Sequence, residues 1–283
     1  MGYEHRITLL GQGSVLAECG PMRLRISAWV GRLPQPEEAL RAAQEALGFL
    51  EQVAVDHPWL LGAWGSVLKE RLGPLGRKML ESVALIGDPD LTPMAAVAGT
   101  IADGVADFLA SRGMTKVIVE NGGDIALRLA QGERVGVGVR PRVDRESLSH
   151  CLRLEGTSPS WGVATSGLGG RSFTRGIAWS ATVLAPKAST ADAAATAVAN
   201  ATWVPCGQAR RARAGELDPD SDIAGLEVTL EVGELPFEVS SKALELGLAK
   251  AMDLKAAGVI EGAFLCVGSL CGSVGLEGFL EAA

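Results

Sequence analysis

Histidine is scarce in this sequence. The 283 residues include three histidines, His5, His57 and His150, which lie far apart along the chain. Metal centres and catalytic triads often use histidine, and they need several ligating or catalytic groups to converge on one point. We therefore expect neither a histidine-rich metal site nor a histidine-based triad.

Cysteine is also too sparse for a thiolate metal site. The five cysteines are an odd number, are scattered, and include no Cys-x-x-Cys pair. Cys266 and Cys271 are close in sequence, but four residues separate them and no histidine is adjacent, so they lack the spacing of zinc ligands. We expect all the cysteines to be reduced thiols of a cytoplasmic protein.

Three further features are missing: clustered positive charge, an N-terminal signal peptide, and an apolar run long enough to cross a membrane. The net charge is −7, and one short basic group, Arg210, Arg211 and Arg213, fits a solvated helix face. We therefore expect no nucleic-acid partner and no membrane partner, and we expect a cytoplasmic location.

No linker and no solenoid-type repeat divides the chain. Hydrophobic residues make up 47% of it, which is enough for a core of ordinary size. We predict a single domain over residues 1–283, and a division into two subdomains remains open.

Short strand-like patterns alternate with a few longer helical ones. Strands are predicted at 7–18, 22–30, 116–120, 125–129, 135–139, 151–154, 161–165, 177–184 and 262–267. Helices are predicted from residue 36 onward and at 59–72, 77–85, 93–111, 190–202 and 241–254, with a brief helix at 210–214. Hairpins interleaved with helices favour an α+β fold of antiparallel strands over a doubly wound parallel sheet.

The most informative stretch is 188–196, Ala-Ser-Thr-Ala-Asp-Ala-Ala-Ala-Thr, which begins a helix of small residues after a strand-like run. Asp192 and Thr196 are four residues apart, so both face the same way on that helix. Two oxygen-bearing groups on one face near a helix start can hold a hard cation or meet a phosphate.

Three other segments have a similar character: the helix start 93–103, the turn 121–124 and the loop 165–171. Glycine turns expose backbone N–H groups, and Asp103 and Asp124 add carboxylates. Together these features suit a nucleotide whose phosphates carry a divalent ion. Each also has a structural explanation, because Asn-Gly-Gly-Asp is a common turn, Asp103 can be a solvated carboxylate and Thr190 can cap its helix.

The acidic turn 218–222, Asp-Pro-Asp-Ser-Asp, invites comparison with a calcium loop. It lacks the glycine and the distal glutamate that such a loop requires. We therefore expect a solvated turn.

Four segments in this order resemble the ApbE-like superfamily, whose best known members are magnesium-dependent FAD:protein FMN transferases. Val-Glu-Asn-Gly-Gly-Asp-Ile at 119–125 and Ala-Thr-Ser-Gly at 164–167 resemble two of its strand ends. Ser-Thr-Ala-Asp-Ala-Ala-Ala-Thr-Ala at 189–197 is similar to its metal-binding element, and 95–103 more loosely resembles its first helix.

This resemblance implies a fold, ligands and residue roles. The fold would be ApbE-like and related to the T-fold, with antiparallel sheets packed against helices, and a homodimer would be expected. The small-molecule ligand would be FAD or FMN with Mg²⁺, and the metal would be held by Asp192 and Thr196. The cofactor-binding residues would be Met94, Gly99, Asp103, Asn121, Gly122, Gly123, Asp124, Thr165, Ser166 and Gly167.

The sequence departs from the family pattern in two places. The lysine that the family carries on its first helix is replaced by Ala98. The family's His-x-x-Asp-Pro element is missing, because residues 166–177 contain no histidine, aspartate or proline. Transfer chemistry needs a group that activates an acceptor hydroxyl, so both departures weigh against flavin transfer and leave the catalytic residues unassigned.

Three hypotheses follow from the residues and the resemblance. The first is a divergent enzyme that binds a flavin or related nucleotide with a divalent metal, as a transferase or hydrolase. The second is a non-catalytic binding or assembly protein on the same scaffold. The third is a factor in sulfur assimilation toward homocysteine, which could use the thiol of Cys206, although an inert buried cysteine is the simpler interpretation.

Overall fold

An antiparallel sheet forms the centre of the molecule. The computed structural model describes residues 4–142 and 147–283. Within these residues, ten strands form one sheet in the order β1-β2-β3-β5-β6-β9-β10-β13-β14, and the short β4 pairs beside β3. The strands are β1 (His5–Leu9), β2 (Val15–Cys19), β3 (Met22–Val30), β4 (Leu33–Pro34), β5 (Lys116–Asn121), β6 (Asp124–Leu129), β9 (Ser160–Ser166), β10 (Ser180–Ala185), β13 (Gly262–Val267) and β14 (Leu270–Val274).

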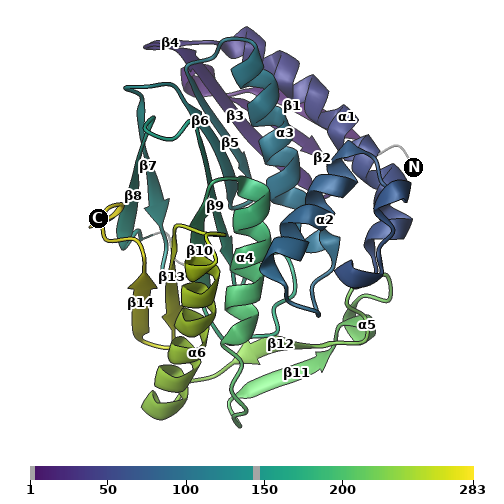
Figure 1. The fold of residues 1–283 in the computed structure, drawn as a ribbon, viewed down its shortest axis with the longest axis vertical. Coiled ribbons are helices and arrows are strands. Elements are labelled where there is room, and N and C mark those ends of the chain that lie inside the picture. Colours follow the sequence, from purple (N-terminus) through teal and green to yellow (C-terminus); the bar gives the residue numbers. More distant parts are fainter. Residues whose placement is uncertain (1–3, 143–146) are drawn as a thin grey trace.

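Helices cover one face of this sheet (Figure 1). They are α1 (Pro36–Leu60), α2 (Pro74–Ile86), α3 (Val97–Ser111), α4 (Ala188–Ala201) and α6 (Phe237–Ala256). A smaller sheet of β15 (Leu280–Ala282), β8 (His150–Glu155) and β7 (Arg134–Val139) packs on the other face around a second apolar core. A hairpin of β11 (Ala209–Arg213) and β12 (Glu227–Val232), with the short helix α5 (Ala214–Leu217), completes the α+β fold that the sequence predicts.

Helix α4 lies at the centre of the helical layer, where it packs against α2, α3, α6, β9 and β10. Its small side chains permit this crowding, and two glycines on neighbouring elements let its first residues approach them closely. A Cβ atom on Gly99 would lie 2.2 Å from the carbonyl oxygen of Ala188, and one on Gly162 would lie 2.1 Å from the carbonyl carbon of Lys187. Both distances are far below van der Waals contact, so these positions accept only glycine while α4 stays where it is.

The helix predicted at 59–72 was wrong. Helix α1 continues to Leu60, and two 3-10 turns, Trp64–Ser66 and Lys69–Arg71, precede α2. The indole nitrogen of Trp64 donates to the carbonyl of Asp88 at 2.8 Å. The buried carboxylate of Asp56 accepts the Gly73 amide at 2.9 Å, immediately before α2 begins. These long-range bonds decide the local conformation, and a helical repeat does not encode them.

Two other local predictions were wrong. Residues 7–18 form two strands, β1 and β2, separated by a 3-10 turn at Gly11–Gly13. Residues 210–213 belong to strand β11 rather than a helix, because they pair with the antiparallel strand β12. Arg210 and Arg211 form ion pairs with Glu231 and Glu227 on that strand.

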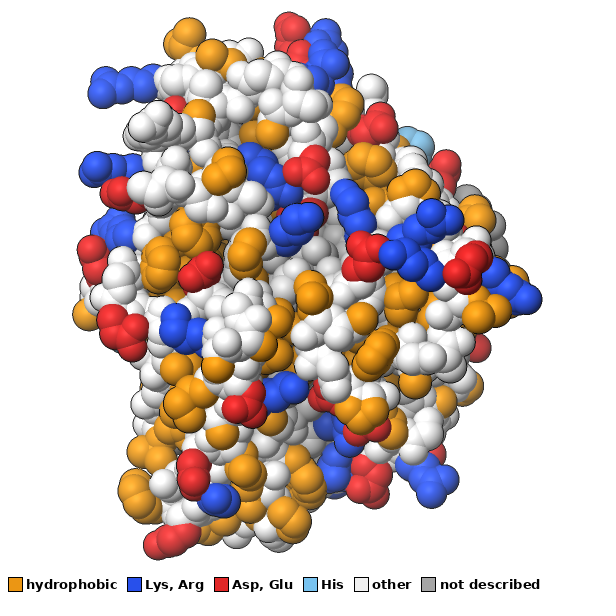
Figure 2. Space-filling model, viewed as in Figure 1, with side chains coloured by type: hydrophobic (Ala, Val, Ile, Leu, Met, Phe, Trp, Pro, Cys, Tyr) orange, Lys and Arg blue, Asp and Glu red, His pale blue; other side chains and the backbone are white. Residues whose placement is uncertain are grey.

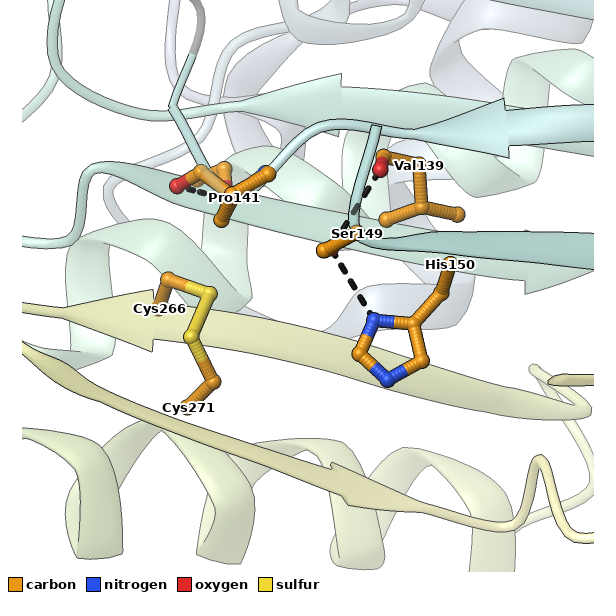
Figure 3. The surroundings of a disulfide bond; sticks show 7 residues. Val139, Pro141, Ser149, His150, Cys266 and Cys271 are labelled. Atoms are coloured by element: carbon orange, nitrogen blue, oxygen red, sulfur yellow. Dashed lines mark hydrogen bonds between the residues drawn. A yellow bond between two sulfur atoms is a disulfide. The ribbon is translucent and has the colours of Figure 1, made fainter. Parts of the chain in front are cut away.

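The expectation that all cysteines are reduced was also wrong for one pair. Cys266 on β13 and Cys271 on β14 lie opposite each other in the hairpin register and form a disulfide (Figure 3). Cys19, Cys151 and Cys206 are free. The short turn between the two strands makes the pair adjacent, and the sequence spacing alone did not reveal this register.

One segment has the length and apolar composition of a membrane span, contrary to the expectation from the sequence. It is Pro93–Ser111, with a mean hydropathy of 1.3 over its most apolar window. This segment is α3 with its preceding turn, and it packs against α1, α4, β5 and β6 as a core helix.

On the face drawn in Figure 2, acidic and basic side chains are interspersed and form no broad patch of one sign.

Candidate functional site

A cavity of about 1050 Å³ opens beside α4. Its wall is formed by the turn before α3, one face of α4, the β5–β6 turn, the end of β9 and the loop after it, part of β7, and the acidic turn 218–222. Segments from the whole length of the chain therefore meet at this point. An apolar side of the wall carries Ile118, Ile125, Val135, Val137 and Val163.

The face of α4 that meets this cavity is polar. Before its last residue, α4 is buried except at Asp192, Thr196 and Asn200, which are partly exposed. All three line the cavity. They are spaced four residues apart, so they form one stripe that extends about 12 Å along the helix. Asp192 and Thr196 thus share a face, as their spacing predicts.

Asp192 is held by the backbone of α3. Its Oδ2 atom accepts the Gly99 amide at 2.9 Å. Burial of the carboxyl raises the pKa of Asp192 well above its usual range, and the carboxylate of Asp124 raises it further. The amides of Gly99 and Ala98 oppose this change. The site therefore contains a carboxylate that would gain from a bound proton or cation.

Asp124 begins β6, directly after the Asn-Gly-Gly-Asp turn. Burial raises the pKa of Asp124 to about 7, while the guanidinium of Arg171 acts in the opposite direction. The Arg171 guanidinium lies against the turn, because a Cβ atom on Gly122 would come within 1.8 Å of its Nη2 atom. Gly122 also has a φ of 69°, a conformation that favours glycine. The predicted β5–β6 hairpin thus places Asp124 and creates the space for Arg171.

Asp124, Asp192 and the hydroxyl of Thr196 form a donor set that suits a hard cation. The carboxylate of Asp124 raises the pKa of Asp192, so a positive charge placed near both groups would stabilise their ionised forms. Mg²⁺ commonly takes one or two carboxylates and completes its shell with water and phosphate oxygens. Within residues 4–142 and 147–283, no group of three His, Cys, Asp or Glu side chains gathers as a metal cluster. The residues therefore fit a metal shared with a ligand better than a site closed by protein alone.

Of the twelve predicted site residues, ten line the cavity: Met94, Asn121, Gly122, Gly123, Asp124, Thr165, Ser166, Gly167, Asp192 and Thr196. Two of these residues form hydrogen bonds to neighbouring elements of the fold. Asn121 donates from Nδ2 to the Ala98 carbonyl at 3.2 Å, and the hydroxyls of Thr165 and Thr182 lie 2.9 Å apart. The structure therefore brings together segments that are up to a hundred residues apart in the sequence.

Gly99 and Asp103 lie behind the cavity wall instead. The carboxylate of Asp103 is buried, accepts the amides of Ala188 and Ser189 at 3.2 and 2.9 Å, and pairs with Arg128 at 2.9 Å. Its oxygens are therefore occupied within the protein, and we assign it to positioning α4 rather than to ligand contact. It also performs the capping that we considered for Thr190, because α4 begins at Ala188 without a side-chain cap of its own.

Sequence reasoning missed much of the cavity's charge. The acidic turn 218–222, expected to be solvated, lines the rim, and the Thr92 hydroxyl donates to Asp222. His57, at the end of α1, also lines the rim, although its position matches no family motif. Among the residues that the structure describes, seven carboxylates and three guanidiniums line the cavity: Asp90, Glu120, Asp124, Asp192, Asp218, Asp220, Asp222, Arg140, Arg171 and Arg175. The lining is therefore acidic, and no local motif signals this, because the charges come from separate segments.

The family described as "AbpE bacteria" matches this chain over residues 7–276. The chain belongs to this family. The expected place in the ApbE-like superfamily is thereby confirmed, and the α+β fold agrees with it.

Proteins similar to this chain include several from archaea that are named UPF0280 protein. The one from Methanococcus maripaludis strain C7 is 38% identical over 125 residues, which are 44% of this chain and 51% of the relative. The one from Methanopyrus kandleri is 41% identical over 110 residues, which are 39% of this chain and 43% of the relative. The chain spans about half the length of the curated relatives it matches.

Two solved structures are similar over nearly the whole chain. The apo flavinyl transferase ApbE of Pseudomonas stutzeri has a TM-score of 0.47 and 14% identity, covering 97% of this chain and 96% of its own. A variant of the flavin transferase ApbE from Vibrio cholerae has a TM-score of 0.48 and 15% identity, covering 98% of each chain. Likeness at this level does not transfer a reaction.

Proposed function

We propose that this protein binds a flavin nucleotide, FAD or FMN, or a related nucleotide, in the cavity together with Mg²⁺. The single observation that carries the proposal is the pair of half-buried carboxylates, Asp124 and Asp192, which line the cavity with Thr196. This pair favours a bound cation, and the phosphates of a nucleotide would complete the shell of that cation.

The charge of the cavity supports the same proposal. Among the described residues, seven acidic side chains outnumber three guanidiniums on the lining, and this balance disfavours a bare phosphate unless positive charge accompanies it. A divalent cation should therefore strengthen the binding of a nucleotide. The apolar side of the wall, which includes Ile125 and Val163, suits a planar ring system. The similarity to proteins named flavin transferases agrees with this choice of ring.

The test is titration of FMN and FAD into the protein in Mg²⁺ and in EDTA, followed by flavin fluorescence and calorimetry. We expect saturable binding that is at least about tenfold tighter with Mg²⁺, since a metal-bridged phosphate adds charge-assisted contacts. Asp192→Ala should remove that dependence. Asp253→Ala, an exposed carboxylate on α6, is the matched control and should leave it unchanged. Absence of saturable flavin or nucleotide binding in either buffer would refute the proposal.

A second candidate is a binding or assembly protein without catalysis. The loop 167–176, which bounds the cavity, contains no histidine or carboxylate that could activate an acceptor hydroxyl. The imidazole of His57 lines the rim and is the alternative base. Release of AMP or FMN from FAD by the wild-type protein, lost in His57→Ala, would establish catalysis and exclude the non-catalytic candidate.

The sulfur-assimilation hypothesis has less support from the geometry. It would use a thiol near the ligand, and Cys206 is not among the residues that line the cavity in the described part of the chain. Growth of a deletion strain on sulfide without homocysteine tests it directly.

A further inference from the structure

Arg175 lies at the end of the cavity opposite Asp192. Its backbone amide donates to Oδ1 of Asn200 at 2.9 Å, and its side chain lines the cavity. Asn200 ends the polar stripe of α4, two helical turns after Asp192. The backbone of Arg175 therefore lies at the Asn200 end of the stripe, about 12 Å along the helix from Asp192, and its guanidinium at Asp90 adds positive charge to the cavity.

The ion pair that Arg175 makes is an exposed one. Its Nη1 atom lies 2.6 Å from Oδ2 of Asp90, whose side chain is 44% exposed. Exposed ion pairs contribute little to stability, so a competing anion can replace this partner. The Nε atom of Arg175 is buried and has no hydrogen-bond partner among the described residues.

Unpartnered polar atoms are concentrated around Arg175. In the described residues, four buried side-chain atoms lack a partner, and three of them belong to Thr174, Arg175 and Arg211. Arg211 donates from Nη2 to the Arg175 carbonyl at 3.4 Å, and its guanidinium stacks 3.9 Å from the centre of the Trp203 ring. Burial lowers the pKa of Arg211, the carboxylate of Glu227 opposes this change, and the charge of Arg175 lowers the pKa further. Glu227 engages the other two guanidinium nitrogens of Arg211, so the unused donors here are the Nε atoms of Arg175 and Arg211, and an anion would satisfy them.

We propose that Arg175 is a binding residue for a phosphate group of the cavity ligand, and that the phosphate displaces Asp90 from the Arg175 guanidinium. Rotation of the side chain away from Asp90 frees its donors for the phosphate, while Arg211, which stays paired with Glu227, lies beside it. Asp90 then acts as an internal competitor. The inference rests on the proposed function in one respect, namely that the phosphate belongs to the ligand in the cavity.

The first test uses inorganic pyrophosphate in EDTA, measured by calorimetry at low ionic strength, so that neither flavin nor metal is needed. Arg175→Ala should weaken binding by at least about tenfold, which corresponds to losing one charge-assisted contact. Asp90→Asn should tighten binding by a few-fold. Arg210→Ala is the control, because Arg210 lies on the neighbouring hairpin, is paired with Glu231 and is exposed. If the Arg175–Asp90 pair is only structural, the two variants will not change pyrophosphate affinity in opposite directions, and the proposal is overturned.

The second test compares FMN with riboflavin, which lacks the phosphate, in the presence of Mg²⁺. Arg175→Ala should reduce the preference for FMN by about tenfold and leave riboflavin binding unchanged. Equal loss for both ligands would contradict a phosphate contact. The two tests separate the proposals, since pyrophosphate binding that depends on Arg175 without any flavin binding would refute the proposed flavin ligand alone. Flavin binding with no effect of Arg175→Ala in either test would refute the phosphate contact alone.

Discussion

The pH dependence of stability tests the carboxylate pair most directly. The pKa of Asp124 is raised from its ordinary 3.8 to about 7 by burial. The native protein therefore binds more protons than the unfolded chain between these two pH values. The free energy of unfolding must then fall as the pH rises from about 4 to about 7, and it should level off above that range.

The size of this change in the free energy of unfolding follows from the pKa shift of Asp124. A fully expressed change from 3.8 to about 7 corresponds to on the order of 4 kcal/mol. The Asp124 side chain is half-buried and faces the cavity, so we expect about 2 kcal/mol after allowing for solvent screening. Mg²⁺ should restore most of this loss near pH 7 and above, because it binds the ionised carboxylates, and it should have little effect near pH 4.

Denaturant unfolding of the wild type and of Asp124→Asn, each in EDTA at a series of pH values, measures this effect. The difference between the two proteins reports Asp124 together with its coupling to Asp192. It removes carboxylates that do not interact with this pair, such as Glu38, whose pKa is lowered by Arg112 and which therefore acts with the opposite sign. The difference in free energy of unfolding between the two proteins should change by about 2 kcal/mol from about pH 4 to about pH 7. A difference that stays flat from pH 4 to 7, or that favours the wild type as the pH rises, would refute the assignment of a buried protonated carboxyl.

Two substitutions test how α4 is held. Asp103→Ala leaves a buried Arg128 and two backbone amides without their partner, so we expect a loss of about 3 kcal/mol or more in denaturant unfolding. Asp107→Ala removes the exposed second partner of Arg128 and should cost less than about 1 kcal/mol; equal losses would contradict the buried cap. Gly99→Ala places a Cβ atom 2.2 Å from the carbonyl oxygen at the first residue of α4 and should cost about 3 kcal/mol, or prevent folding. Gly48→Ala, where a Cβ atom meets no neighbour within 4 Å, should be neutral or stabilising, and a Gly99→Ala protein as stable as this control would show that α4 can shift freely.

The acidic lining of the cavity affects how the proposed ligand would bind. For the proposed phosphate ligand, a cation bound at the Asp124–Asp192 pair would offset the negative charge of the described lining. The phosphate contact inferred for Arg175 offers a second source of positive charge at the opposite end of the α4 stripe. A ligand that carries both a metal-bound phosphate and a ring would use the two ends and the apolar wall together.

Local sequence patterns predicted the elements whose conformation depends on local forces. The β5–β6 hairpin follows from an Asn-Gly-Gly-Asp turn between two apolar runs, and α3 follows from its helical repeat and its Ser-Arg-Gly end. The predictions failed at 59–72 and 210–213, where the chain takes its conformation from distant partners. Trp64 bonds to Asp88, and β11 pairs with β12. Propensity is a weak guide wherever such tertiary bonds compete with it.

The candidate site divides in the same way. By itself, the sequence determined that Asp192 and Thr196 share one helix face, because a spacing of four residues is a local property of the helix. Only the tertiary structure placed Asp124 against Asp192, enclosed Asp103 beneath α4, and brought the acidic turn and Arg175 to the same cavity. Burial and charge coupling arise from segments that meet across the fold, and for that reason they decide which carboxylates can act on a ligand.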